Sequence, residues 1–326
     1  MTDPLLSVVV PAYNECDVLP EFHRRLMGAV SAIPNVRAEI VYVNDGSSDS
    51  TLSILEGFTK NSNQVALINL SRNFGKEIAM TAGLDHAAGD AIVVIDSDLQ
   101  DPPELIPRLV EEWRAGFDVV YAKRMQRNGE SWFKRVSAAA FYRLIRNVNR
   151  VQIPSDTGDF RILSRRAVDA LLKLREHHRF MKGLFAWIGF RSKAIEYERD
   201  PRFAGETKFN YWKLWNFALE GITAFTIAPL KLATYLGLFV SMVAFCYLFK
   251  IVAFTLLYGD PVRGYPTIMV TVLFLGGTQL FFIGLIGEYV GRIFNETKRR
   301  PLYFVEQFRS SKYTSQMKNE ESARHE

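Results

Sequence analysis

The sequence predicts an α/β domain with a largely parallel sheet, followed by a hairpin of two membrane-spanning helices. Two observations predict this fold class. Short apolar stretches alternate with helix-like stretches through the first part of the chain, and two long apolar runs lie nearer its end. The 326 residues are enough for one large core or for two smaller domains.

Four short apolar stretches rich in β-branched residues are predicted to be strands. They cover residues 6–11, 39–44, 65–69 and 91–95. Helix-like stretches separate them at 18–31, 50–60 and 76–88. This alternation predicts a nucleotide-binding sheet, in which ligands lie beyond the carboxyl ends of the strands.

Polar and acidic side chains follow three of these predicted strands, at the point where each strand ends. Because the carboxyl ends of parallel strands meet at one edge of a sheet, the three clusters are expected to converge on one crevice. The clusters are Tyr13, Asn14 and Glu15; Asn44, Asp45, Gly46 and Ser47; and Asp96, Ser97 and Asp98.

The two long apolar runs cover residues 232–257 and 268–290. Each can span roughly 30 Å of hydrocarbon as a helix. Lys250 and Glu288 lie close enough to the ends of their runs to reach the membrane interface. A helical hairpin buried in a protein core is the alternative, but the short polar link GDPVRGYP favours a membrane hairpin. The chain is therefore predicted to divide into a first domain at 1–225, a transmembrane hairpin within 226–295, and a tail at 296–326.

Basic residues beside the predicted spans indicate their orientation. The connecting loop offers only Arg263. Bases next to the outer ends of the hairpin are more numerous, and they are Lys231, Arg292, Lys298, Arg299 and Arg300. Since basic flanks favour the cytoplasmic side, both termini are expected in the cytoplasm. The chain starts MTDPLLSVVV, without a basic leader and cleavage site, so we expect that the first domain is not exported.

The formal net charge of +5 is suited to an anionic partner. The charge is too small to indicate nucleic acid in the absence of a recognition motif, and the sequence has none that we recognise. An anionic lipid or a phosphorylated ligand is the partner that the composition favours.

Two amphipathic stretches, 131–148 and 210–225, precede the hairpin. Phe133 and Leu144 share one face of the first, and Tyr211 and Trp215 share one face of the second. Each could be a core helix with a solvated back. Their aromatic and basic residues, close to a membrane hairpin, favour helices that lie in the membrane interface. The polar tail from Ser310 is predicted to be disordered.

The segment DSDLQDPPE, residues 96–104, directly follows the apolar stretch AIVVI. Two carboxylates separated by one residue at a strand end can share a hard divalent cation, and such a cation can bind two phosphate oxygens. An acidic turn whose Asp101 caps the next helix is the alternative. The position after a buried strand and the two companion clusters favour the cation site.

The motifs SVVVPAYNE, VNDGSSDST, NFGKEIAMTAG and DSDLQDPPE resemble, in order and spacing, those of family-2 glycosyltransferases with the GT-A fold. The resemblance extends over nearly the whole chain. The segments SDTGDFRILSRRAV, FAGETKFNYWKL and GEYVGRIFNETKRRPLYFV are similar to the polyprenyl-phosphate branch, which includes bactoprenol glucosyltransferases and dolichol-phosphate mannose synthases. The resemblance implies a Rossmann-like nucleotide-binding domain of the GT-A type.

The resemblance also implies roles for individual residues. Asp96 would orient the donor, and Asp98, with Gln100, would bind Mg²⁺ or Mn²⁺. Lys76 would face the donor phosphates and Asp159 would lie beside the donor sugar and the acceptor; without the resemblance, a solvated lysine and a turn aspartate are alternatives. The nucleoside would be held by Pro11, Ala12, Tyr13, Glu15 and Asp45, with Asp45 accepting a hydrogen bond from the uracil or guanine ring.

Candidates for binding the lipid phosphate are Arg124, Lys134 and Arg135, although a plain basic surface facing the membrane explains each of them equally well. Arg202 and Lys208 flank Gly205 in a segment that resembles the active-site lid of the branch. Closure of such a lid would bring positive charge to the phosphates.

The resemblance implies transfer of a sugar, with glucose from UDP-glucose as the first choice, onto undecaprenyl or another polyprenyl phosphate, with inversion. The location implied is the bacterial inner membrane, and homo-oligomers are possible. A processive polysaccharide synthase, whose relatives carry an Arg-Trp pair that this sequence lacks, is an alternative. A transferase with a soluble or protein acceptor and a non-catalytic nucleotide-sensing scaffold are others.

Overall fold

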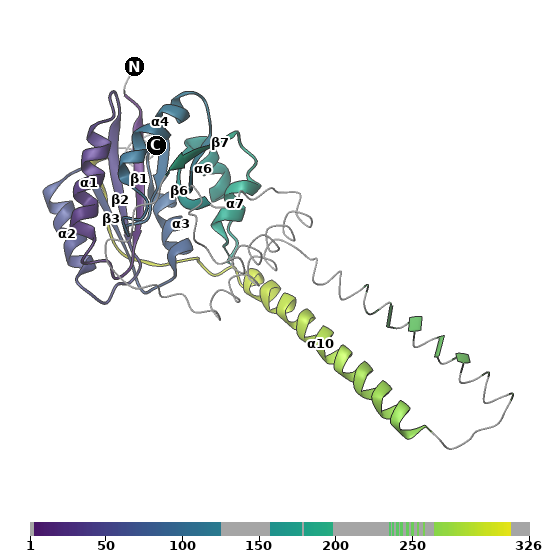
Figure 1. Ribbon diagram of the computed structural model, residues 1–326. Coiled ribbons are helices and arrows are strands. Elements are labelled where there is room, and N and C mark those ends of the chain that lie inside the picture. Colours follow the sequence, from purple (N-terminus) through teal and green to yellow (C-terminus); the bar gives the residue numbers. More distant parts are fainter. Residues whose placement is uncertain are drawn as a thin grey trace, which may run out of the picture.

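An eight-stranded mixed sheet forms the centre of the described part of the protein in this computed structural model (Figure 1). The structure describes residues 3–124, 157–177 and 179–197, separate positions between 235 and 257, and 264–313. The strand order is β7-β5-β6-β4-β1-β2-β3-β8. Its parallel part confirms the four predicted strands as β1 (Leu5–Ala12), β2 (Arg37–Asn44), β3 (Val65–Leu70) and β4 (Ala91–Val94).

The three predicted helices are also confirmed, with ends that differ by at most two residues. They are α1 (Leu19–Ser31), α2 (Thr51–Asn61) and α3 (Lys76–His86). In α1, Leu19, Phe22 and Leu26 are fully buried, because their spacing places them on one face of the helix. The α/β alternation of the sequence is therefore the alternation of the fold.

The remainder of the sheet was not predicted element by element. Helix α4 (Ile106–Arg114) follows a short 3₁₀ turn, η1 (Pro103–Leu105), and leads into β5 (Val119–Arg124). Strand β6 (Thr157–Ser164) runs antiparallel between β4 and β5, and β7 (Ser192–Tyr197) pairs parallel with β5 at the edge. Helices α6 (Arg165–Leu172) and α7 (Met181–Trp187) lie between β6 and β7 in the chain.

Helices cover both faces of the sheet, so the central strands are buried on both sides (Figure 1). Val8 and Val10 belong to the core shared with α1 and α4, whereas Val9 belongs to the core shared with α3, α6 and α7. This alternation follows from the two-residue period of a strand. It explains why the predicted strands are continuous apolar runs.

The order of the parallel strands determines where a ligand can bind. From β1 the chain proceeds to β2 and β3 on one side, and β4 then pairs with the other side of β1. The carboxyl ends of β1 and β4 therefore flank the topological switch point, where open α/β sheets bind their ligands. Residues from Pro11 onward and from Asp96 onward lie at this point.

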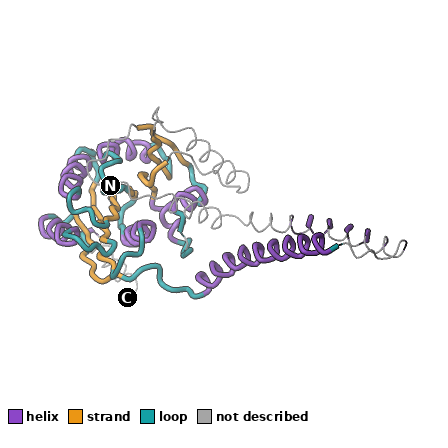
Figure 2. Tube along the Cα trace, turned by 60° about the horizontal axis from the view of Figure 1, so that its bottom comes forward, coloured by secondary structure: helices purple, strands orange, loops and turns teal. Residues whose placement is uncertain are grey.

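Helix α10 (Tyr265–Thr297) covers the second predicted apolar run and is longer than it at both ends. It projects from the sheet domain in both views (Figures 1 and 2). Its segment Phe274–Thr297 is long and apolar enough to cross a membrane, the one such helix among the described residues. The hypothetical Cβ of Gly237, a position within the first predicted run, lies 3.9 Å from the Phe282 ring, so the two runs are neighbours there. Most of 232–257, and the amphipathic stretches 131–148 and 210–225, lie outside the described residues.

The chain returns from α10 to the sheet and adds a last strand, β8 (Val305–Arg309), which pairs antiparallel with β3. The prediction that disorder begins at Ser310 is wrong for the first residues, because Ser311 and Tyr313 are buried. The Ser311 hydroxyl donates to the buried Glu39 carboxylate at 2.6 Å, and Ser7 Oγ donates to the same group at 2.6 Å. A buried carboxylate requires such donors, and here the segment after the hairpin supplies one.

Candidate active site

The loops after β1 and β2 are bonded to each other. The Asn14 main-chain N–H donates to Ser47 Oγ at 3.0 Å, and Asn14 Oδ1 accepts from the Ser48 N–H at 2.9 Å. Gly46 has a φ of +64°, and an added Cβ would lie 2.4 Å from the main-chain carbon of Arg72. Only glycine fits this close approach, so the loop after β2 packs against the segment after β3.

Asp45 organises the start of α3. Its Oδ1 accepts the Phe74 N–H at 2.7 Å and its Oδ2 accepts the Gly75 N–H at 2.9 Å. The side chain is only 2% exposed. Contact of Asp45 with a nucleoside base stays a prediction, and its observed bonds are to the loop that directly precedes Lys76. Tyr13, by contrast, is exposed at the end of β1.

The acidic segment after β4 forms a tight turn. Asp98 Oδ1 accepts the Gln100 main-chain N–H at 3.0 Å, and Leu99 has a φ of +57°. Positive φ in a residue with a Cβ is strained, and such strain gathers at functional sites. Pro102 occupies the N-cap position of η1, and the buried Asp101 carboxylate accepts the Tyr197 hydroxyl.

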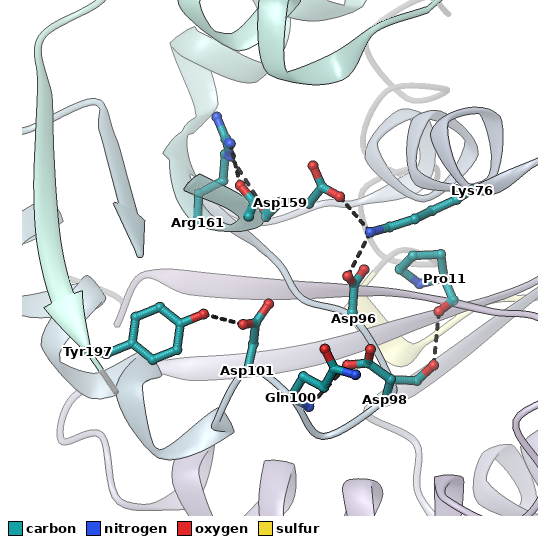
Figure 3. A network of polar contacts seen from close by, with 11 residues as sticks. Pro11, Lys76, Asp96, Asp98, Gln100, Asp101, Asp159, Arg161 and Tyr197 are labelled. Carbon is teal, nitrogen blue, oxygen red and sulfur yellow. Dashed lines mark hydrogen bonds and ion pairs between the residues drawn. The ribbon is translucent and has the colours of Figure 1, made fainter. Parts of the chain in front are cut away.

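Lys76, Asp96 and Asp159 meet at the switch point, as Figure 3 shows. The Lys76 ammonium lies 2.6 Å from Asp96 Oδ2 and 2.5 Å from Asp159 Oδ2. Because β6 is antiparallel to β4, with Val94 opposite Arg161, the first residues of β6 lie beside the residues that follow β4. The tertiary structure thus brings together three predicted site residues from three separate segments.

The charges of this group determine the protonation of Asp159. Burial by itself would raise the pKa of Asp159, but the ammonium groups of Lys76 and Lys182 outweigh burial and lower the pKa to about 2. Burial likewise opposes the charged form of Lys76, yet Asp96 and Asp159 raise the Lys76 pKa. Both groups are therefore ionised at neutral pH.

Arg161 supports Asp159 and was missed in the sequence. Its guanidinium donates to the main-chain oxygens of Gly158 at 2.8 Å and Asp159 at 3.3 Å, and it lies 3.8 Å from the centre of the Phe185 ring. Burial lowers the pKa of Arg161 to about 10, so the side chain stays charged at neutral pH. The signal in the sequence was an arginine inside the apolar strand segment DFRIL.

Glu77 is a second residue that the sequence analysis missed. It lies in the first turn of α3, directly after Lys76. Burial raises the pKa of Glu77 to about 7, and the negative charge of Asp159 contributes to the increase. Its Oε2 atom is buried and has no hydrogen-bond partner among the described residues, as is also true of Asp159 Oδ1. Such orphaned acceptors are rare in native proteins and call for a donor.

Among the described residues, no group of three or more His, Cys, Asp or Glu side chains is arranged to hold a metal ion. The residues predicted to bind Mg²⁺ or Mn²⁺ are Asp98 and Gln100, which lie together in the turn after β4 (Figure 3). Carboxylate and amide oxygens are ligands that such cations accept, and Mg²⁺ commonly binds through one or two carboxylates plus substrate phosphates. The donor set therefore fits a cation that is completed by a ligand.

The basic residues predicted to bind the lipid phosphate are not described to the same extent. Arg124 ends β5, one position after Lys123, whose ammonium pairs with Glu196 at 3.1 Å. Lys134 and Arg135 lie outside the described residues, as do the predicted lid residues Arg202 and Lys208.

Comparison with known proteins identifies the class. Residues 7–172 match glycosyl transferase family 2, and residues 228–293 match the GtrB C-terminal hairpin. The chain is 50% identical to an uncharacterised glycosyltransferase of Synechocystis sp., over 92% of this chain and 94% of that protein. It is 47% identical to the bactoprenol glucosyl transferase of Shigella phage SfX, over 92% of this chain and 98% of that protein.

The chain therefore belongs to glycosyl transferase family 2. It is a glycosyltransferase with a mixed α/β sheet and a C-terminal hairpin of the GtrB type. Among solved structures, mannosyl-3-phosphoglycerate synthase from Rubrobacter xylanophilus superposes with a TM-score of 0.46 at 17% identity, over 67% of this chain and 71% of that one.

Proposed function

We propose that the protein transfers glucose from UDP-glucose to a polyprenyl phosphate and so produces a polyprenyl-phosphate glucose. The observation that carries this proposal is the meeting of Lys76, Asp96 and Asp159 at the switch point, beside the Asp98 turn. The relatives named bactoprenol glucosyl transferases support glucose and the lipid carrier, since the match extends over 98% of one of them.

A divalent cation, Mg²⁺ or Mn²⁺, is part of the proposal. Asp98 and Gln100 would hold it, and when bound it would supply charge neutralisation for the leaving diphosphate. Asp96 would orient the donor. Lys76 would face the donor phosphates, since its ammonium already lies at the site, 2.6 Å from Asp96 Oδ2.

The acceptor explains why no strong base is required. A phosphate monoester has a second pKa near 6, so its oxygen is largely ionised at neutral pH. Asp159, with a pKa of about 2, is a poor proton acceptor in this range. Its role in the proposal is to orient the reacting groups through its charge while the lipid oxygen attacks with inversion.

The remaining basic residues would act on the acceptor. Arg124, Lys134 and Arg135 are proposed to bind the lipid phosphate, and Arg202 and Lys208 to belong to a lid that closes over the two anions. The support is chemical: bringing two phosphates together requires several cations, and arginine binds phosphate with two parallel bonds.

The function is tested with purified protein, undecaprenyl phosphate and a panel of nucleotide sugars. We expect transfer from UDP-glucose that requires both a divalent cation and the long-chain lipid. Full activity in the presence of a chelator would refute the requirement for a divalent cation. Turnover with a water-soluble acceptor would favour a soluble-acceptor transferase, and repeated addition of sugar to one acceptor would favour a processive synthase.

We also propose that residues 226–295 form a transmembrane hairpin at the bacterial inner membrane, with the domain at 1–225, the tail at 296–326 and both termini in the cytoplasm. The apolar segment Phe274–Thr297 and the basic flanks of the predicted spans support this arrangement. The short loop near 259–266 would then face the outside.

Cysteine labelling tests this topology. Cys16 and Cys246 are free thiols and must first be replaced. In the protein without these two cysteines, we expect an impermeant reagent added to intact cells to label an Asp260→Cys variant. The same reagent should not label a Ser310→Cys variant. Labelling of the Ser310→Cys variant from outside would refute the orientation and, with it, access of the site to cytosolic nucleotide sugar.

A further inference from the structure

Two acceptors on the side of the site that faces α3 are unsatisfied within the part of the chain that the structure describes. Asp159 Oδ2 is bonded to Lys76, whereas Asp159 Oδ1 is buried with no partner among the described residues. Glu77 Oε2 is likewise buried with no partner in the described ranges, and the Glu77 carboxylate is close enough to Asp159 for the two charges to interact. Leaving a buried acceptor unpaired is costly, so a hydrogen-bond donor is expected there when the site is in use.

The chemistry of the missing donor can be inferred from what surrounds it. The oxygens of an ionised diphosphate carry no proton to donate, so the donor diphosphate is not the partner of these two acceptors. Hydroxyl groups are donors that suit carboxylates, and a hexose carries several of them on neighbouring carbons. Lys76, the neighbour of Glu77 in the chain, lies between Asp96 and Asp159. In the proposed function these three residues contact the donor from its phosphates to its sugar.

We propose that Glu77 is a specificity-determining residue that accepts a hydrogen bond from a hydroxyl of the transferred sugar, next to Asp159. This proposal rests on the proposed function, and it adds a residue outside the acidic motifs. Glu77 is held in place by the first turn of α3, whose start is fixed by the bonds from the Phe74 and Gly75 N–H groups to Asp45. Rejection of the wrong sugar would follow from leaving the Glu77 acceptor unpaired in a buried site.

The test combines substitutions with donors that lack one hydroxyl. Glu77→Leu removes both acceptor oxygens at similar size, and Glu77→Gln retains one. With UDP-glucose, kcat/KM should fall about ten- to hundredfold for Glu77→Leu and less for Glu77→Gln, the range expected for hydrogen bonds to charged groups. With the parent enzyme, one of the 2-, 3-, 4- and 6-deoxy analogues should have a kcat/KM lower than that of UDP-glucose by a similar factor. With Glu77→Leu, the kcat/KM of the same analogue should be little lower than that of UDP-glucose.

Controls separate a contact with sugar from a structural role. UDP affinity, measured by calorimetry, should change less than about twofold in both variants, because UDP lacks the sugar. Glu111→Gln, an exposed glutamate of α4, should leave all rates unchanged. A uniform loss across the deoxy series, or weakened UDP binding, would overturn the proposal.

The parent enzyme by itself provides a further test, even if the variants do not fold. If it uses UDP-glucose but no single deoxy analogue is discriminated by more than about threefold, Glu77 does not select the sugar. If the parent enzyme does not use UDP-glucose at all, the proposed function fails instead, so the two failures are distinguishable.

Discussion

Replacing Asp98 by asparagine is expected to reduce turnover by more than about a hundredfold, since even residues that only support metal ligands cost 10- to 100-fold when changed. A neutral amide cannot replace a carboxylate on a hard cation. The Asp98 Oδ1 bond to the Gln100 N–H can be retained by the amide oxygen, so the turn should keep its shape. The measurement is the rate of glucose transfer across a titration of Mn²⁺ and Mg²⁺.

The matched control is Asp169→Asn. Asp169 is an exposed residue of α6 whose partner is Arg165, at 2.8 Å, and surface pairs of this kind contribute little. This variant should keep parental rates and metal dependence. An Asp98→Asn enzyme with parental turnover, or one whose rate does not depend on metal concentration, would show that the cation is not held at Asp98.

For Asp159→Asn, we expect kcat to fall about a hundred- to a thousandfold while donor affinity changes less than about threefold. The carboxylate lies at the reacting centre of the proposed site and pairs with Lys76, whereas the nucleotide would be bound at the ends of β1 and β2. An asparagine of the same shape removes the negative charge with little change in packing. The two quantities are measured as single-turnover rates and as binding of UDP-glucose.

The pH dependence separates an orienting residue from an obligatory base. The pKa of Asp159 is lowered to about 2, so the parent enzyme holds this group ionised at every pH from about 6 to 9, and protonation would begin only far below this range. The lipid phosphate is also largely ionised. The residual rate of Asp159→Asn should therefore vary with pH as the parental rate does. A steep rise with pH in the variant alone would mean that Asp159 removes a proton.

The role of Asp45 is an instance in which local sequence and tertiary structure give different information. Its place after a strand predicted a residue of the site, and it does lie at the carboxyl edge of the sheet. The sequence could not indicate that both carboxylate oxygens accept main-chain N–H groups at the start of α3. Those donors are some thirty residues away in the chain, and only the packing of the loop against Gly46 brings them near.

The sequence by itself determined the parallel strands, their helices and the acidic residues at the strand ends. Burial on both faces makes each parallel strand a continuous apolar run, and the change to polar residues marks its end. The same local signal identified α10, because a helix that can cross a membrane must be apolar over many consecutive residues.

Only the tertiary structure decided how Asp159, Glu77 and Arg161 relate to the site. Strand β6 enters the sheet antiparallel to β4, and this pairing is what places Asp159 beside Asp96. The pairing of β8 with β3 is a second such contact. Strand β8 follows α10 in the chain and brings Ser311 to the buried Glu39. The physical reason is that such contacts join residues far apart in the chain, and their energy depends on burial and on partners that no local pattern records.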